Sequence, residues 1–286
     1  MKTRSHSLAA GIALTAIVLG LFLVLSGAGP ALSSATLAAL AAQASTPTPL
    51  PDDVIPLTSI SELSSLNATV TIDVNGLIDG QRAQGDLTAL LATNDQGKSK
   101  VTVSGGLLGD IAAQVGGSVV GLFTPSKVDL YKVPQGAYVV VNGLFPLCVK
   151  PDAANATEAL DKMSPSGLLD MLTSSDVARG ELVGEETLNG VPVKHYVVDG
   201  DAFLVAAQNS ADPQLRAFGE ALWSAEDIHL YVDAAGGYPV ALRGSYSGAF
   251  EPLKFEGDFD VAIDLTDVNA NNRIDLPSSC NRPISR

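Results

Sequence analysis

The segment LNATVTIDV, residues 66–74, alternates apolar and polar side chains along its whole length. Every even-numbered residue is apolar, and every odd-numbered residue is Asn, Thr or Asp. Because successive side chains of a β-strand point to opposite faces, this period of two predicts a strand with one buried face and one solvated face. A sheet with one wet face is expected to be antiparallel.

Similar strand patterns follow on both sides of a central region. They are predicted at residues 85–93, 98–104, 127–133, 136–141, 180–187, 191–199, 227–232, 240–246 and 253–266. Turn residues separate several of them, as at 94–97 and 134–136. In the last strand one face is expected to carry Phe255, Gly257, Phe259, Val261, Ile263 and Leu265, and the other Glu256, Asp258, Asp260 and Asp264.

Helical patterns are fewer and lie between the strands. Short helices are predicted at residues 152–163 and 165–172, where Pro165 suits a first helical turn. A longer pattern at 202–223 is interrupted by Asp212 and Pro213. Residues 105–123 are apolar and glycine-rich, and their pattern fits a helix, a strand pair or a lid. The predicted fold class is α+β: an antiparallel β half-barrel with helices packed on its concave face.

Three segments resemble the mycobacterial LppX/LprG-type envelope lipoproteins, which have the wider LolA-like fold. They are residues 180–201, 228–246 and 259–277. The first segment contains the residue spacing of a strand pair in these lipoproteins, which is matched here by Gly184, Glu185, Gly190, Val191 and Tyr196. The last segment contains a second spacing, which is matched by Asp267, Asn269, Ile274 and Pro277. The resemblance spans residues 58–277 and implies a lipid-binding half-barrel. The chain departs from these lipoproteins in lacking the cysteine that they acylate.

The amino terminus has the pattern of an export signal. Lys2 and Arg4 precede an apolar run at residues 8–25, and LSGA at 25–28 resembles a lipoprotein cleavage site with Ala28 in place of cysteine. The run is cleaved as a signal, or it is retained as a membrane anchor. The predicted divisions are an export signal or anchor at 1–44, a proline-rich linker at 45–57 and one lipid-binding domain at 58–286. The predicted location is extracytoplasmic, in the cell envelope, either anchored or secreted.

The charge of the chain is strongly asymmetric. The net charge is −14, and because Lys2 and Arg4 are the only charged residues before Asp52, the rest of the chain carries −16. Such a surface repels phosphate backbones, so nucleic acid is not expected as a partner. Adhesion to anionic lipid headgroups through charge alone is disfavoured for the same reason.

The two cysteines, Cys148 and Cys280, have no CxxC or Cys/His spacing that would suggest a metal site. An even number of cysteines in an exported chain favours a disulfide between them. Two free buried thiols are the alternative.

Catalytic motifs are weak throughout. The sequence GSYSG at 244–248 has Tyr246 where a nucleophilic serine would stand, and His195 and His229 lie on predicted strands without a partner motif. A calcium-binding loop beginning at Asp267 would have glycine at its sixth position and glutamate at its twelfth. This chain has Asn272 and Ser278 at those positions. We therefore expect a non-catalytic protein without a metal or cofactor.

The remaining signal is an excess of apolar side chains on the predicted helices and in residues 105–123. Together with the resemblance, this excess predicts a cavity that binds acyl chains of a lipid or glycolipid. Its expected lining is Leu107, Leu108, Ile111, Val115, Val119, Leu122, Phe123, Leu160, Met163, Leu168, Leu169, Met171, Leu172, Phe203, Leu215, Phe218, Leu222 and Trp223. The alternative function is a membrane-tethered structural or sensory domain with a filled core. The sequence does not indicate an oligomeric state.

Overall fold

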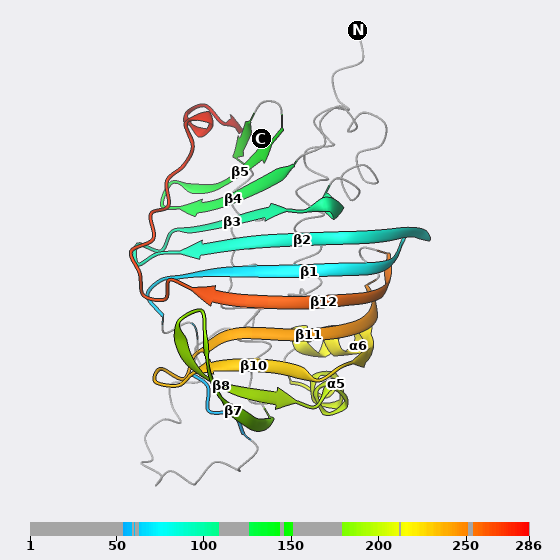
Figure 1. Ribbon diagram of the computed structural model, residues 1–286. Coiled ribbons are helices and arrows are strands. Elements are labelled where there is room, and N and C mark those ends of the chain that lie inside the picture. Colours follow the sequence, from blue (N-terminus) through cyan, green and yellow to red (C-terminus); the bar gives the residue numbers. More distant parts are fainter. Residues whose placement is uncertain are drawn as a thin grey trace.

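A computed structural model of the chain (Figure 1) describes residues 54–58, 60, 63–108, 126–143, 146–150, 179–211, 213–250 and 254–285. The predicted export segment, the predicted helices at 152–163 and 165–172, and most of residues 105–123 lie outside these ranges. The linker and domain boundaries therefore stay predictions. Val54 already pairs with Arg179, and Ile55 is buried in the core.

The described strands form one long, twisted sheet (Figure 1). In chain order they are β1 (Leu66–Ile78), β2 (Gln81–Thr93), β3 (Ser99–Ser104), β4 (Lys127–Val133), β5 (Gly136–Asn142), β6 (Leu147–Lys150), β7 (Glu181–Leu188), β8 (Val191–Val198), β9 (Leu222–Ala225), β10 (Ile228–Asp233), β11 (Pro239–Phe250), β12 (Phe255–Thr266) and β13 (Ile284–Ser285). The spatial order is β13-β6-β5-β4-β3-β2-β1-β12-β11-β10-β8-β7, and β9 pairs with β11.

The sheet confirms the predicted antiparallel pairing. Every described pair of neighbouring strands is antiparallel except β13 with β6, which is parallel. Each predicted strand within the described residues is present. β2 and β11 are longer than predicted, and the period of two in β1 extends beyond Val74 to Ile78.

The face assignment for the last strand is also confirmed. In β12, Phe255, Phe259, Val261, Ile263 and Leu265 are buried, whereas the acidic residues between them are exposed or half-buried. We call the face that carries these apolar residues the inner face of the sheet, and the opposite face the outer face. Residues directly paired across strands share a face, so the register extends this assignment to the neighbouring strands.

Three glycines meet in one row across the inner face. Gly76 of β1 is paired with Gly257 of β12, which is paired with Gly248 of β11. A Cβ atom at Gly76 would collide with the backbone carbonyl of Glu256, and one at Gly257 with the backbone of Gly76. The row therefore allows an approach of neighbouring strands that side chains would prevent, as is typical where a sheet bends.

The predicted helical region 202–223 contains two helices. α5 (Gly200–Gln208) begins after Asp199, whose Oδ1 accepts a hydrogen bond from the Ala202 backbone N–H at 2.7 Å. α6 (Pro213–Ala221) begins at the proline that interrupts the predicted pattern. The prediction is wrong at its end, because Leu222 and Trp223 belong to β9, where pairing with β11 overrides the helical spacing.

The two helices pack on the inner face of the sheet. Phe203 of α5 and Phe218 of α6 lie 6.1 and 5.9 Å, between ring centroids, from Tyr246 of β11. Tyr246 in turn stacks on Phe259 of β12. The fold is therefore an antiparallel half-barrel with helices on its concave face, as predicted.

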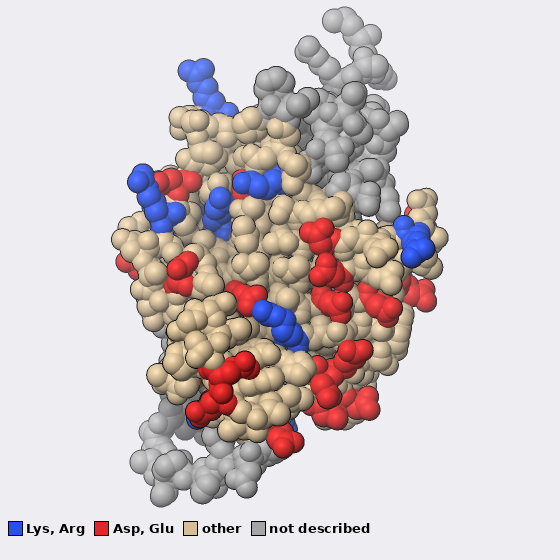
Figure 2. All heavy atoms as spheres, viewed as in Figure 1, with Lys and Arg blue, Asp and Glu red and all other residues tan. Residues whose placement is uncertain are grey.

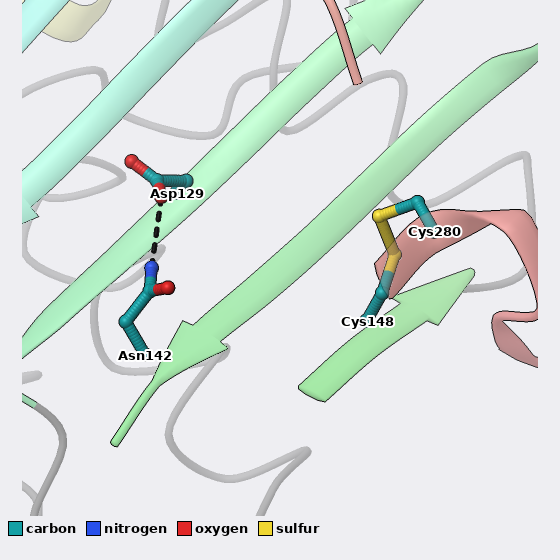
Figure 3. The surroundings of a disulfide bond; sticks show 4 residues. All are labelled: Asp129, Asn142, Cys148 and Cys280. Atoms are coloured by element: carbon teal, nitrogen blue, oxygen red, sulfur yellow. Dashed lines mark hydrogen bonds between the residues drawn. A yellow bond between two sulfur atoms is a disulfide. The ribbon is translucent and has the colours of Figure 1, made fainter. Parts of the chain in front are cut away.

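The carboxyl-terminal segment packs on outer-face residues of β4, β5 and β6 and is joined to β6 by a disulfide (Figure 3). Cys148 of β6 bonds to Cys280 in the short 3₁₀ helix η4 (Ser278–Asn281), which confirms the predicted pairing over free thiols. A second, smaller apolar core forms under this segment, from Tyr131, Val133, Tyr138, Val140, Cys148, Ile274 and Cys280. β6 and β13, which hold this end of the sheet, were not predicted.

Within the described ranges, no helix has both the length and the apolar character needed to cross a membrane.

Candidate functional site

Six of the predicted cavity residues lie within the described structure and are fully buried. They are Leu107, Leu108, Phe203, Leu215, Phe218 and Leu222. All six belong to the main core, together with the inner-face residues of the strands. The structure thus brings residues from the segment after β3, both helices and β9 into one apolar interior.

Trp223 is placed differently from these residues. Its side chain is 55% exposed, because it points away from the interior on β9 while Leu222 points inward. The other predicted lining residues lie outside the described residues: Ile111, Val115, Val119, Leu122, Phe123, Leu160, Met163, Leu168, Leu169, Met171 and Leu172.

Aromatic rings fill the space between the helices and the sheet. Tyr246 and Phe259 stack with their centroids 5.4 Å apart, and Phe218 meets both Tyr246 and Phe250. Phe250 is also 5.4 Å from Phe259 in an edge-to-face arrangement. Such contacts stabilise the packing beyond the area that they bury. These ring contacts lie under α5 and α6.

A band of the inner face beside the aromatic cluster retains some accessible apolar surface. Val261 is 8% exposed and its partner on β1, Ile72, is 7% exposed, whereas Ile263, one row away, is completely buried. In the next row the side chain of Val74 is only half-buried. Toward the β1–β2 turn, Ile78 and Phe255 are also slightly accessible. We call Ile72, Val74, Ile78, Phe255 and Val261 the accessible band.

Polar groups are scarce on the inner face. The buried polar residues of the described structure are Ser65, Asn94, Thr102, Asp129 and Ser210. Thr102 and Asp129 lie on the outer face, and the other three lie outside the strands. The hydroxyl of Tyr246 is different: it is buried on the inner face and has no hydrogen-bond partner within the described structure. Burial raises the pKa of Tyr246, so the phenol is neutral and can donate a hydrogen bond.

The sequence motif around Tyr246 does not form a nucleophile elbow. Residues 244–248 lie inside β11, which continues to Phe250. In the sequence, Tyr246 is notable only because it stands where a nucleophilic serine would. Its alternation with Gly244 and Gly248 places two residues without side chains beside it on the same strand face.

Charges are separated on the outer face (Figure 2). Acidic side chains gather over β1, β2 and β12, and basic side chains over β3 and β4. The register places Asp86, Asp73 and Asp260 directly opposite one another on three neighbouring strands. Like charges in directly paired positions destabilise a sheet, so this acidic row does not contribute to folding stability.

Asp129 is the most deeply buried carboxylate of the described residues. It accepts hydrogen bonds from the Thr102 hydroxyl at 2.6 Å and the Asn142 amide at 2.8 Å (Figure 3). The ammonium groups of Lys100 and Lys127 lie 3.7 and 3.6 Å from its oxygens. Its hydrogen-bonding capacity is used within the protein, which indicates a structural role.

His195 and His229 meet on the outer face of the sheet. His195 Nε2 of β8 lies 2.9 Å from His229 Nδ1 of β10, and His195 Nδ1 lies 3.4 Å from Glu186 Oε1. The His195 ring also stacks on Tyr231. Burial and the neighbouring His229 lower the pKa of His195, and Glu186 opposes them. Sequence spacing could not reveal this cluster, because it depends on which strands pair.

The loop at 267–275 is tied to the rest of the chain by its own polar side chains. Asp267 accepts a hydrogen bond from the Asn67 amide at 2.8 Å, and Asn269 accepts two from Ser64 at 3.0 Å. These bonds occupy oxygens that a calcium ion would need. Across the described residues, no group of three or more His, Cys, Asp and Glu side chains is placed to hold a metal ion.

The chain matches no known protein-family profile, and no curated protein sequence matches it. Solved structures show distant likenesses. LprF from Mycobacterium bovis is 14% identical over 76% of this chain and 90% of its own, with a TM-score of 0.35. A DUF1329 family protein from Desulfovibrio piger is 10% identical over 75% of this chain and 88% of its own, with a TM-score of 0.23.

A third solved structure is a putative outer membrane lipoprotein-sorting protein domain from Vibrio parahaemolyticus. It is 6% identical over 74% of this chain and 87% of its own, with a TM-score of 0.22. At TM-scores this low, the likenesses carry no conclusion about what the chain does.

Proposed function

We propose that the chain is a non-catalytic, extracytoplasmic lipid-binding protein that holds acyl chains between the inner face of its curved sheet and the helices. The proposed binding region is the accessible band, with the apolar residues predicted at 105–123 and 152–172 completing the lining. In this proposal the run at residues 8–25 exports or anchors the chain, residues 45–57 link it to the domain, and the domain carries lipid within the cell envelope.

The observation that supports this proposal best is the accessible band itself. Its side chains keep some accessible surface, whereas Ile263, one row away on the same face, keeps none. Val74 is half-buried, and the other four residues of the band, 6–8% exposed, follow the same face of β1 and β12 toward the β1–β2 turn. An acyl chain lying along this path would cover them without needing a polar partner.

Burial of the ligand alone would provide the affinity. Each methylene removed from water contributes about 0.8 kcal/mol, so a long acyl chain binds well without charged or catalytic groups. On the inner face of the described strands, the only buried polar groups are tyrosine hydroxyls, which fits a ligand of hydrocarbon character.

A second function is favoured by the aromatic cluster. Under α5 and α6 the interior is filled by Phe203, Phe218, Tyr246, Phe250 and Phe259. If the whole interior is filled in this way, the chain is a tethered structural or sensory domain that acts through protein contacts. The two functions differ in whether the accessible band takes up a ligand.

Binding of saturated fatty acids of increasing length tests the proposal. Affinity should rise about fourfold for each added methylene until the band is covered. The variant Val74→Phe places a ring in the band and should weaken binding of the longest acids. Leu77→Phe, on the outer face of the same strand where Leu77 is 44% exposed, is the matched control and should bind as the parent does.

Affinity that is independent of chain length would contradict a hydrocarbon site. Binding of the longest acids by Val74→Phe as tight as by Leu77→Phe would show that the acids adsorb outside the band and would favour the filled-core function.

A further inference from the structure

The hydroxyl of Tyr246 is a polar group in an apolar interior. The side chain is 3% exposed, and its oxygen is buried without a hydrogen-bond partner in the described structure. A buried hydroxyl without a partner costs folding free energy, whereas phenylalanine would provide the same ring contacts without that cost. Because the hydroxyl does not stabilise the folded chain, its presence suggests a partner other than the chain itself.

The aromatic ring of Tyr246 is held in one orientation. It stacks on Phe259 at an interplanar angle of 23°, and the edge-on ring of Phe218 packs against it from α6. The hydroxyl extends along β11 to lie over Gly244, where a Cβ atom would be 2.5 Å from the phenolic oxygen. Glycine at position 244 therefore leaves the space that the hydroxyl occupies.

This position adjoins the accessible band. Gly244 is paired with Val261, and Val261 with Ile72, so the hydroxyl lies over the row whose side chains keep accessible surface. Val74 follows in the row of Tyr246 and Phe259. A chain lying along the band would thus pass beside the one buried, unpartnered donor of the inner face among the described residues.

We propose that the Tyr246 hydroxyl is the polar anchor of the bound lipid and donates a hydrogen bond to the carbonyl oxygen of an ester-linked acyl chain. This inference rests on the proposed lipid-binding function. It adds that the lipid is ester-linked and that its carbonyl lies at the Tyr246 hydroxyl. A carbonyl is the group that fits. It accepts a hydrogen bond without donating one, it is uncharged, and it stands at the head of a hydrocarbon chain.

A charged headgroup does not fit the same position. The rings around the hydroxyl belong to Phe203, Phe218 and Phe259, and none of the ion pairs found in the described residues involves an inner-face neighbour of Tyr246. A phosphate buried there would lack a counter-charge, which is strongly unfavourable. The headgroup is therefore expected beyond the ester, toward solvent.

The test uses two lipids that differ only in the carbonyl. The full chain is freed of lipid, and binding of 1,2-dipalmitoylglycerol is compared with binding of the ether-linked 1,2-dihexadecylglycerol. Tyr246→Phe should weaken binding of the ester lipid roughly threefold to tenfold, the usual worth of one hydrogen bond, and leave the ether lipid unchanged. Tyr196→Phe, at another buried tyrosine of the inner face, is the control and should change neither affinity.

The thermal stability of the lipid-free protein gives an independent readout. Because the hydroxyl lacks a partner in the folded chain, Tyr246→Phe should unfold at the same temperature as the parent or higher. A lower unfolding temperature would mean that the protein or a water molecule already satisfies the hydroxyl, and would overturn the inference.

The other outcomes separate this inference from the proposed function. If the parent binds both lipids and Tyr246→Phe alters them equally or not at all, the chain binds lipid but Tyr246 is not its anchor. If the parent binds neither lipid, the proposed function itself fails.

Discussion

His195 shows how one residue can acquire a role that its sequence neighbours do not suggest. It lies between Glu186 of β7 and His229 of β10, and its ring stacks on Tyr231. Two imidazole nitrogens 2.9 Å apart can share one proton in a hydrogen bond, but a second proton would place two positive charges in contact. The cluster therefore favours a neutral His195.

This arrangement makes folding stability depend on pH. Burial, and then His229, lower the pKa of His195 in the folded protein below its ordinary value of 6.5, with Glu186 opposing them. The unfolded chain therefore binds this proton at higher pH than the folded chain. Stability from this residue is fully present above the unfolded value, and it falls as pH drops from about 6.5 toward the lower folded value.

We expect His195→Gln to reduce this pH dependence. Urea unfolding at about pH 7.5 and about pH 5.5, a range that brackets the ordinary histidine pKa, should show a smaller loss of unfolding free energy in the variant than in the parent. Parallel losses in the two proteins would assign the pH dependence to other groups.

At the scale of elements, the strands were predictable from the sequence and their partners were not. The period of two in LNATVTIDV and in residues 253–266 shows that one face of each strand is buried. It is the same whichever strands lie on either side, so it does not identify the partners. Whether His195 would face His229, or Asp73 would face Asp86 and Asp260, depends on register and strand order. Neither is written in a single strand.

The elements that were missed are short or depend on distant contacts. β6 and β13 have few residues and lie at one edge of the sheet, where the disulfide holds them. β9 continues directly from α6, and only its pairing with β11 distinguishes it from a helical turn. Of the candidate site, the apolar residues of α5, α6 and β9 were found from helical spacing, whereas the accessible band and the Tyr246 hydroxyl required the sheet.

The glycine row is expected to be essential for the bend of the half-barrel. Gly76→Ala would bring a methyl group into the Glu256 carbonyl and the Phe255 ring, so unfolding free energy should fall by about 1–3 kcal/mol. Gly184→Ala is the matched control, since this strand glycine has open space where a Cβ would stand. Urea denaturation measures both, and a Gly76→Ala variant as stable as Gly184→Ala would show that the close approach is not required.

The disulfide joins residues 132 positions apart and holds the carboxyl-terminal segment over the outer core. Replacing both Cys148 and Cys280 by serine should lower the unfolding free energy by about 2–4 kcal/mol, because the unfolded chain gains freedom. It should also expose Tyr131 and Tyr138, which are now buried. Denaturation with and without reductant measures the first effect, and tyrosine fluorescence the second. A reduced parent as stable as the oxidised one would contradict this role.

At the scale of the whole molecule, the two faces of the sheet have different characters. On the outer face, acidic side chains gather over β1, β2 and β12 and basic side chains over β3 and β4 (Figure 2). The inner face is apolar, with one buried hydroxyl lacking a partner in the described ranges. The outer face is thus charged, and we propose that the apolar inner face binds the acyl chain of a lipid.

The proposal also explains why apolar residues are so frequent in the sequence. Part of them lies in the run at 8–25, part forms the inner faces of the strands, and the remainder on the helices and at 105–123 is proposed to enclose a ligand. A filled core would instead use the same residues against one another, as the aromatic cluster under α5 and α6 does.

Native mass spectrometry of the full chain, expressed in a lipid-containing bacterial host, tests lipid binding most directly. We predict masses above that of the polypeptide, released by organic solvent and yielding ester-linked acyl chains on fragmentation, with less bound lipid in Val74→Phe than in Leu77→Phe. Repeated recovery of the bare polypeptide, together with an experimental structure in which side chains fill the accessible band, would contradict the account.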